Sequence, residues 1–229
     1  MKILVVDIGG NNVKLYPPGA SRARTSFPSG PALTPAAMVA GVRTGAQRWS
    51  YEAVTLGIPA PVARGRLLAE PVNLGAGWIE FDYEAAFERP VKLVNDAAMQ
   101  ALGSYKGGRM LFLGLGTGLG SAVVSDGRLD PLELGHLPYR KGTFEDYVGR
   151  QGLARLGKKK WRRHVARVVK ILVDALLPDD VVIGGGNVKK LKRLPSGARA
   201  GSNDNARRGG VRLWKEAVSS APRPRRSPR

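Results

Sequence analysis

A short pattern of strand, glycine-rich turn and strand occurs twice in this chain, and it constrains the fold more than any other feature. The first copy covers residues 4–15 and the second covers residues 110–124. In each copy two apolar runs flank a turn rich in glycine, and alternating helix and strand patterns follow. The repeat predicts an α/β protein built from two similar lobes that face each other.

The boundary between the lobes is expected at the segment Lys106-Gly107-Gly108-Arg109. We therefore predict an N-terminal lobe over residues 1–108, a C-terminal lobe over 109–218 and a disordered basic tail over 219–229. The tail is rich in Pro, Ser and Arg and has little to bury, so a solubilising end without further function is its simpler interpretation.

Several helices can be placed from their caps and apolar spacing. Thr34 and Pro35 open one helix, because Thr caps free N–H groups and Pro suits the first helical position. Thr143 is expected to cap a helix over residues 144–156, followed by a long amphipathic helix from Lys158 to Leu177. A last helix over about 205–217 is a candidate to pack back on the N-terminal lobe.

Composition narrows the chemistry. Apolar residues make up 43% of the 229 residues, and cysteine is absent. Disulfides, cysteine nucleophiles and thiolate metal sites are therefore excluded, which fits a reducing compartment. The N-terminus lacks the pattern of a signal peptide, and no apolar run has the length of a bilayer, so we expect a soluble cytoplasmic protein without membrane contact.

Positive charge is concentrated in the second part of the chain. The net charge is +19, and residues 1–139 carry 13 Lys and Arg against 11 Asp and Glu. Residues 140–229 carry 24 Lys and Arg against 7 Asp and Glu. A field this one-sided favours a polyanionic partner such as nucleic acid, a phosphate polymer or an acidic surface.

Four turns that follow predicted strands could carry chemistry: DIGGNN, VND, GLGTGLG and VIGGGN. Each by itself is typical of a tight turn in which glycine supplies a positive φ. The glycine spacing matches neither the dinucleotide fingerprint nor the P-loop. Glycine also lets backbone N–H groups approach phosphate, and Asp7 could hold Mg²⁺ through water, although a turn-capping role for Asp7 is equally open.

Taken together, the motifs resemble those of a known family. DIGGNNVK, VNDAAMQALG, GLGTGLGSAVV, ELGH and VVIGGGN occur in the order and spacing of ROK-family sugar kinases, within the actin-like ATPase superfold. The resemblance covers about residues 2–217, and the length and Lys14 are most similar to the polyphosphate glucokinase branch. It implies a two-lobed actin-like (RNase H-like) fold with the active site in the interlobe cleft.

The resemblance implies a hexokinase- or glucokinase-type phosphotransferase. It would transfer a phosphoryl group from polyphosphate, ATP or both to the 6-hydroxyl of a hexose, most simply glucose, with Mg²⁺ as cofactor and Asp96 as general base. The implied phosphate and nucleotide contacts are Asp7, Gly9, Gly10, Asn11, Asn12, Lys14, Gly116, Thr117, Gly118, Gly120, Gly184, Gly185 and Gly186. The implied sugar contacts are Asn73, Asn95, Asp96, Glu133, His136 and Glu145.

Simpler structural roles are open for some of these residues. Asn95 is a natural N-cap for the helix that follows it, and this role is compatible with sugar binding. His136 could be held by a structural hydrogen bond. A carboxylate and an imidazole in ELGH nevertheless suit sugar hydroxyls, because together they donate and accept.

The chain departs from the family pattern at two places. Typical ROK kinases carry a CxCGxxGC zinc motif after the Gly-His pair, whereas this chain has no cysteine, so no structural zinc of that kind is expected. His136 must then be held by packing or hydrogen bonds. Asn11 stands where the family usually has Thr or Ser, which changes a phosphate contact and leaves the phosphoryl donor open.

The segment KKKWRRHVARVVK at 158–170 is the most basic part of the expected long helix. A solvated amphipathic helix is one interpretation. The other is a track for inorganic polyphosphate formed by Lys158, Lys159, Lys160, Arg162 and Arg163, held by counterion release. A single Trp and no interleaved aromatics favour incidental nucleic-acid affinity over functional RNA binding.

Two other functional classes remain to be weighed. A non-catalytic ROK-like sugar-binding regulator would need a DNA-binding module ahead of the strand that begins at residue 2. An RNase H-like nucleic-acid-binding protein would need a carboxylate cluster around two metals, for which Asp7 and Asp96 are the candidates. ROK kinases are often dimers, so a homodimer is a further expectation.

Overall fold

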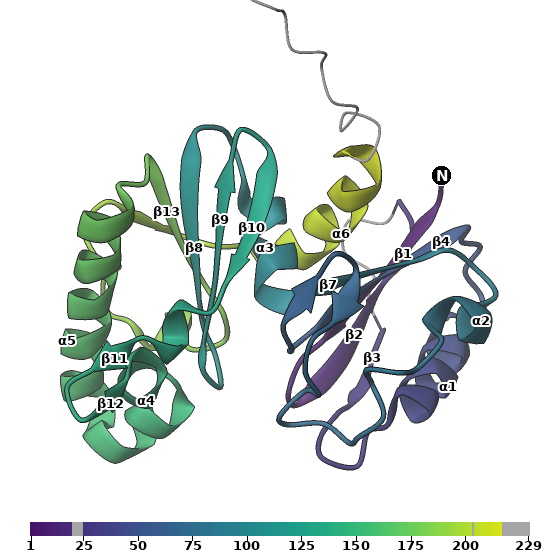
Figure 1. Ribbon diagram of the computed structural model, residues 1–229, viewed down its shortest axis with the longest axis horizontal. Helices are drawn as coiled ribbons and strands as arrows, with labels where there is room; N and C mark the ends of the chain where they lie inside the picture. Colours follow the sequence, from purple (N-terminus) through teal and green to yellow (C-terminus); the bar gives the residue numbers. More distant parts are fainter. Residues whose placement is uncertain (20–24, 203, 217–229) are drawn as a thin grey trace, which may run out of the picture.

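Two five-stranded sheets organise the computed structural model, which describes residues 1–19, 25–202 and 204–216 (Figure 1). The first sheet has the strand order β3-β2-β1-β4-β7 and the second β10-β9-β8-β13-β14. In each sheet the first two pairings are antiparallel and the last two are parallel. The two-lobed α/β architecture predicted from the repeat is confirmed.

The first sheet lies in the N-terminal half. Its strands are β1 (Ile3–Ile8), β2 (Asn12–Tyr16), β3 (Thr25–Pro28), β4 (Ala53–Ile58) and β7 (Val91–Asn95), and β5 (Val62–Ala63) with β6 (Arg66–Leu67) forms a separate hairpin. Helices α1 (Pro35–Ala46) and α2 (Tyr83–Phe87) cover its outer face (Figure 1). Thr34 accepts a hydrogen bond from the Ala37 N–H and Pro35 is the first residue of α1, as the sequence predicts.

The second sheet repeats this arrangement. Its strands are β8 (Arg109–Leu115), β9 (Leu119–Ser125), β10 (Arg128–Leu132), β13 (Asp180–Gly184) and β14 (Ala198–Ala200). Between β10 and β13 lie the 3₁₀ turn η1 (Leu134–His136), the hairpin of β11 (Pro138–Tyr139) and β12 (Gly142–Thr143), and helices α4 (Phe144–Val148) and α5 (Arg150–Leu176). The 3₁₀ turn η2 (Val188–Lys190) precedes β14.

The helix expected over 144–156 is wrong in its extent. Gly149 has an extended backbone and ends α4, so the chain turns there and α5 begins at Arg150. The expected start of the long helix at Lys158 is confirmed, because Gly157, whose φ of 70° belongs to the left-handed region, breaks α5 directly before Lys158. No helix in the described ranges is both long and apolar enough to cross a bilayer.

Helices α3 (Asp96–Ser104) and α6 (Asn205–Glu216) lie between the two sheets (Figure 1). Their backbones approach closely, because a side chain at Gly103 would collide with the Asn205 carbonyl and one at Gly209 with the Met99 carbonyl. A buried cluster of Val5, Ala98, Met99, Phe112 and Val182 joins both sheets to these helices. The two lobes therefore share a central core, and α6 also packs against β1 and β4.

Each sheet also has a core on its outer face. Met38, Val42, Leu56 and Trp78 are fully buried in the N-terminal lobe. Trp161 packs α5 into the core beside the second sheet. Its indole N–H donates to the Val148 carbonyl of α4 at 2.7 Å. The order of layers is thus helix, sheet, helix pair, sheet, helix.

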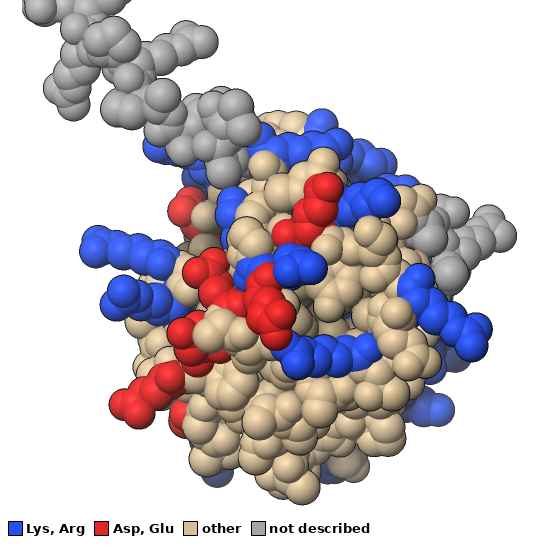
Figure 2. Space-filling view, turned by 90° about the vertical axis from the view of Figure 1, so that its right-hand side faces the viewer, with Lys and Arg blue, Asp and Glu red and all other residues tan. Residues whose placement is uncertain are grey.

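The end of the molecule formed by α1 and α2 carries both signs of charge. Asp and Glu side chains gather there among Lys and Arg (Figure 2). This agrees with the near balance of charge in residues 1–139, and the excess of positive charge lies in the second part of the chain. The expected tail at 219–229 and the last residues of the second lobe lie outside the described residues, so the domain limits remain a prediction.

Candidate active site

The predicted motifs lie at the carboxyl ends of parallel strands. Strands β1, β4 and β7 run parallel, so the turn after β1 and the Asn95-Asp96 pair at the end of β7 share one edge. Strands β8 and β13 are also parallel, and their glycine turns share an edge of the second sheet. Ligands of open α/β sheets bind at such edges.

Asp7 is the penultimate residue of the fully buried strand β1 and is itself only 6% exposed. Its cross-strand neighbour is Lys14, whose Nζ lies 3.6 Å from Asp7 Oδ2. A single carboxylate at this place suits Mg²⁺, which binds through one or two carboxylates and its ligand's phosphates. Within the described ranges no group of three or more His, Asp or Glu is arranged to hold a metal by itself.

The first turn, Gly9 to Asn12, is closed by its own backbone. Gly9 N–H donates to the Asn12 carbonyl at 3.0 Å, and Ser29 N–H donates to the Asn11 carbonyl at 3.0 Å. The expectation that Gly9 and Gly10 supply positive φ is wrong: of the motif glycines in the described residues, only Gly185 has it, at 87°. Gly10 instead faces the other lobe, since a Cβ there would lie 3.6 Å from Thr117 Oγ1.

Asn73 joins the same neighbourhood. A Cβ on Gly10 would lie 3.9 Å from Asn73 Cβ, so Asn73 stands beside the first turn and Thr117 of the second. The structure thus brings together three predicted residues that are far apart in sequence. It places Asn73 beside the predicted phosphate turns.

The second turn, between β8 and β9, uses glycine for close packing. A side chain at Gly118 would collide with the Glu145 carboxylate, and a Cβ at Gly120 would lie 2.6 Å from Ala97 Cβ. Gly116 has no neighbour within 4 Å of an added Cβ, so its position is open. Packing at Gly118 and Gly120 thus brings the second turn against Glu145 and the start of α3.

The third turn is tied to the second by a residue that the sequence analysis did not single out. Asn187 is 8% exposed, and its side-chain N–H donates to the Gly116 carbonyl at 2.9 Å. Its backbone N–H donates to the Leu115 carbonyl at 3.0 Å. The signal was present as the last letter of VVIGGGN, but its partner lies in another motif.

Asp96 begins α3 and lies among other acids. Burial raises the pKa of Asp96 to about 7, and the negative charges of Asp7 and Glu133 add to this effect. A hydrogen bond of 2.8 Å from the Ala97 N–H to Asp96 Oδ1 works in the opposite direction. A carboxyl with this pKa can take up a proton near neutral pH.

Asn95 has the structural role expected of an N-cap. Its Oδ1 accepts from the Ala98 N–H at 3.1 Å, and its Nδ2 donates to the Ala60 carbonyl at 3.2 Å. The two bonds fix the orientation of the amide and the start of α3. Any sugar contact of Asn95 would use its remaining donor and acceptor capacity.

Glu133, His136 and Glu145 form one polar cluster beside Asp96. His136 Nε2 lies 3.7 Å from Glu145 Oε1. The pKa of Glu133 is raised by burial and by Glu145, while His136 counteracts this. The His136 side chain is 63% exposed and is therefore open to a ligand. The η1 turn and the contact with Glu145 hold it in place.

The cations of the basic segment of α5 differ in their exposure and contacts. Lys158, Lys159, Lys160 and Arg163 are exposed. Arg162 is half-buried, and its Nε donates to the Lys190 carbonyl at 2.7 Å, which ties α5 to η2. A structural role therefore accounts for Arg162, whereas the exposed cations retain both interpretations.

Arg150 is a further residue that the motifs did not point to. It is the first residue of α5, and its Nη2 lies 3.1 Å from Thr117 Oγ1 and 3.4 Å from Asn11 Oδ1. Its backbone N–H donates to the Thr117 carbonyl at 2.9 Å. Arg150 therefore bridges the first and second turns.

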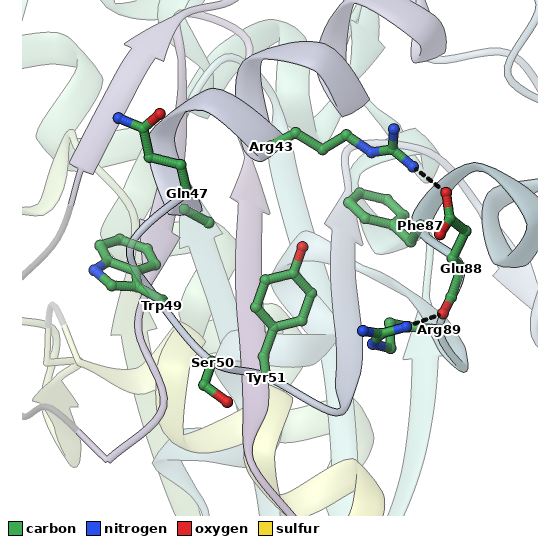
Figure 3. A pocket seen from close by; sticks show the side chains of 9 residues that line it. Arg43, Gln47, Trp49, Ser50, Tyr51, Phe87, Glu88 and Arg89 are labelled. Carbon is green, nitrogen blue, oxygen red and sulfur yellow. Dashed lines mark hydrogen bonds and ion pairs between the residues drawn. The ribbon is translucent and has the colours of Figure 1, made fainter.

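A pocket on the N-terminal lobe lies apart from these residues (Figure 3). It is lined by Arg43, Ala46, Gln47, Trp49, Ser50, Tyr51, Phe87, Glu88 and Arg89, none of which the sequence analysis predicted as a site residue. The Arg43 guanidinium donates to Glu88 and to the Ala86 carbonyl. Its charge is thus already paired within the protein.

The whole fold matches solved structures of sugar kinases. It superimposes on the inorganic polyphosphate/ATP-glucomannokinase of Arthrobacter sp. strain KM with a TM-score of 0.81 and 22% identity, covering 95% of this chain and 99% of that one. It matches the ROK family glucokinase of Streptomyces griseus, solved with glucose and AMPPNP, with a TM-score of 0.77 and 16% identity, covering 93% and 99%. The chain therefore has the fold of the ROK kinases.

The sequence relatives are more specific. The chain is 33% identical over 106 residues to the polyphosphate glucokinase of Mycobacterium leprae (strain TN), and the match covers 43% of this chain and 33% of that protein. It is 32% identical over 114 residues to the polyphosphate glucokinase of Mycobacterium tuberculosis (strain CDC 1551 / Oshkosh), covering 44% and 42%. The match thus spans less than half of these relatives. The resemblance to the polyphosphate glucokinase branch is confirmed at this level.

Two further comparisons limit what these matches show about function. No protein-family model matches the chain. A ROK family transcriptional regulator, a homologue of the E. coli MLC protein, also shares the fold, with a TM-score of 0.69, 16% identity, and coverage of 95% of this chain and 78% of that one. The fold by itself therefore accommodates both kinases and regulators.

Proposed function

We propose that this chain is a ROK-type sugar kinase that transfers a phosphoryl group to the 6-hydroxyl of a hexose, with glucose as the expected substrate. The observation that carries the proposal is the position of Asp96, a carboxyl with a pKa of about 7 beside Asp7 and the Glu133 cluster. The names of the sequence relatives and structural neighbours support the same reaction.

The polar cluster provides the sugar side of this proposal. Glu133, His136, Glu145 and the free capacity of Asn95 supply donors and acceptors for several hydroxyl groups. Asp96 takes the proton from the 6-hydroxyl as its oxygen attacks the terminal phosphorus of the donor. The bond between that phosphorus and the leaving phosphate oxygen breaks in the same transfer.

The glycine turns provide the phosphate side. Gly10 and Gly118 let backbone N–H groups of the two turns approach the donor without side chains between them, while the Gly116 N–H donates to the Gly118 carbonyl at 3.2 Å and closes the second turn. Asp7 would hold Mg²⁺, and the ion would supply positive charge that offsets the charge of the donor's phosphates. The Asn187 contacts keep the third turn beside the second, where a nucleotide or a longer phosphate chain would continue.

The donor is proposed to be inorganic polyphosphate, ATP or both. Polyphosphate is supported by the similarity to polyphosphate glucokinases and by the exposed cations Lys158, Lys159, Lys160 and Arg163 along α5. A polymer with one charge per phosphate is attracted by such a series of cations and releases counterions on binding.

The proposal is tested with purified protein, glucose, Mg²⁺ and each donor in a coupled assay for glucose 6-phosphate. Asp96→Asn keeps the shape of the side chain but removes the base, so we expect turnover to fall by about 10²- to 10⁴-fold. Glucose binding, measured by calorimetry, should change little. Turnover close to that of the original protein would reject Asp96 as the base, and no product from any hexose with either donor would reject the kinase.

A sugar-binding regulator is the second candidate, because a ROK regulator shares the fold. It would bind the hexose without turnover and without any effect of a phosphoryl donor. The same calorimetric and coupled measurements therefore separate the two functions.

A further inference from the structure

Arg150 occupies a place that no motif assigns. Its guanidinium contacts Asn11 of the first turn and Thr117 of the second, and the contact to Asn11 joins positions 139 residues apart. Asn11 is also the residue that departs from the family pattern. The structure thus connects the unusual residue to an arginine.

The contacts of Arg150 leave much of its hydrogen-bonding capacity free. Among the described residues no carboxylate forms an ion pair with it, and both side-chain contacts are made by Nη2 to neutral oxygen atoms. Guanidinium carries five N–H donors and prefers a bidentate acceptor. The contact to Asn11, at 3.4 Å, is also long and therefore weak.

Two other arginines of the same lobe have stronger protein partners. Arg199 donates to both oxygens of Asp180 and to the Ser104 carbonyl. Arg155 donates to the Asp146 carbonyl and lies over the Tyr147 ring, 5.1 Å from its centroid. Arg150, by contrast, lies between two glycine turns, and its side chain donates only to two neutral oxygen atoms, one of them at 3.4 Å.

We propose that Arg150 binds the phosphoryl donor, and that its guanidinium takes up two oxygens of the donor's phosphate groups. Asn11 positions the guanidinium before the donor arrives, and a charged phosphate oxygen replaces the weaker amide contact. The inference rests on the proposed function, because it takes the two turns to be the donor site. The recognised chemistry is that of phosphate oxygens, which inorganic polyphosphate and a nucleoside triphosphate share.

The test compares Arg150→Met and Arg150→Lys with the original protein. Initial rates are measured against glucose, polyphosphate and MgATP in turn. Losing the bidentate contact should lower kcat/KM for the donor by about 10- to 100-fold in Arg150→Met, while KM for glucose stays within about twofold. Arg150→Lys keeps the charge without the fork, so it should recover part of the loss.

Arg48→Met is the matched control, because Arg48 is exposed and lies just after α1, outside every proposed site. It should leave all rates unchanged. Thermal unfolding of each variant checks that the fold is retained. If Arg150→Met does not fold, the donor kcat/KM of Arg150→Lys provides the test instead. A loss seen with polyphosphate only, or with MgATP only, supports the inference and identifies the source of the phosphate.

Unchanged donor kcat/KM in Arg150→Met with both donors would overturn the inference and leave the proposed kinase intact. A rise in KM for glucose without any donor effect would overturn it as well. If the original protein makes no sugar phosphate with either donor, the proposed function itself fails, and the inference fails with it.

Discussion

At the scale of single residues, the environment of Asp96 decides how the proposed reaction depends on pH. Burial and the charges of Asp7 and Glu133 favour the protonated carboxyl, so the pKa rises from its ordinary value to about 7. A protonated Asp96 cannot accept a proton from the sugar. Activity should therefore be present above this pKa and be lost as the pH falls through it.

We expect kcat/KM for glucose to fall about tenfold for each pH unit below about 7. Glu133→Gln removes one of the charges that raise the pKa of Asp96, so the acid limb should move to lower pH. The measurement is a pH profile of kcat/KM from pH 5 to 9 for both proteins. An acid limb already near pH 4 in the original protein, or one that Glu133→Gln moves upward, would contradict the assignment.

At the scale of elements, α4 and the hairpin before it hold the polar cluster in a chain without cysteine. Thr143 and Asp146 form a reciprocal capping box at the start of α4. The hydrogen bonds from Thr143 lower the pKa of the Asp146 carboxyl. Tyr139 contacts Phe144, Tyr147 and His164 through their rings. These contacts stabilise the segment that corresponds, by the resemblance, to the zinc motif of typical ROK kinases.

Thr143→Ala removes one half of the capping box and should lower the free energy of unfolding by about 1 kcal/mol. Because α4 carries Glu145, KM for glucose should rise as well. Urea unfolding and glucose titration measure the two effects. Thr44→Ala is the control, since Thr44 lies on α1, donates only to the Ala40 carbonyl and is exposed. Equal glucose affinity in the two variants would contradict the proposed role of α4.

The basic part of α5 makes a separate prediction. Replacing Lys158, Lys159 and Lys160 by Ser should lower kcat/KM for polyphosphate and weaken its dependence on salt, because fewer counterions are released. The value for MgATP should change little. The control replaces Arg48, Arg66 and Lys106, which are exposed on the other lobe, and so removes the same charge. An equal loss in both triple variants would show that net charge, and not a track, attracts the polymer.

At the scale of the whole molecule, α3 and α6 join the two lobes through a shared core. Their approach depends on Gly103 and Gly209, at which a side chain would meet the backbone of the facing helix. Asp96 begins α3, so the same contact determines how the proposed base stands relative to the second sheet. The stability of this interface and the geometry of the site are therefore coupled.

Gly209→Ala should lower the free energy of unfolding by about 1–3 kcal/mol, because the added methyl group overpacks the contact with Met99. The sign is informative, since Ala in an open helical position would stabilise the protein by about 1 kcal/mol. Urea unfolding measures the change. Arg208→Ala, at an exposed neighbouring position that loses an ion pair with Asp204, should stay within about 0.5 kcal/mol. A more stable Gly209→Ala protein would show that the helices can separate without cost.

The sequence by itself determined the repeat of strand, turn and strand, the caps at Thr34 and Thr143, and the order of the motifs. These features depend on neighbouring residues or on regular spacing, so they can be recognised along the chain. The sequence also pointed to Asp7, Asp96, Glu133, His136 and Glu145, because a resemblance in ordered motifs carried them.

Only the tertiary structure decided which of these residues meet. It placed Arg150 against Asn11 and Thr117, tied Asn187 to Gly116, and showed that Gly118 and Gly120 are needed for close packing and not for positive φ. It also ended the helix after Thr143 at Gly149, which brought Arg150 to the two turns. Contacts of this kind join residues that are distant in sequence and leave no periodic pattern, so only the packed chain reveals them.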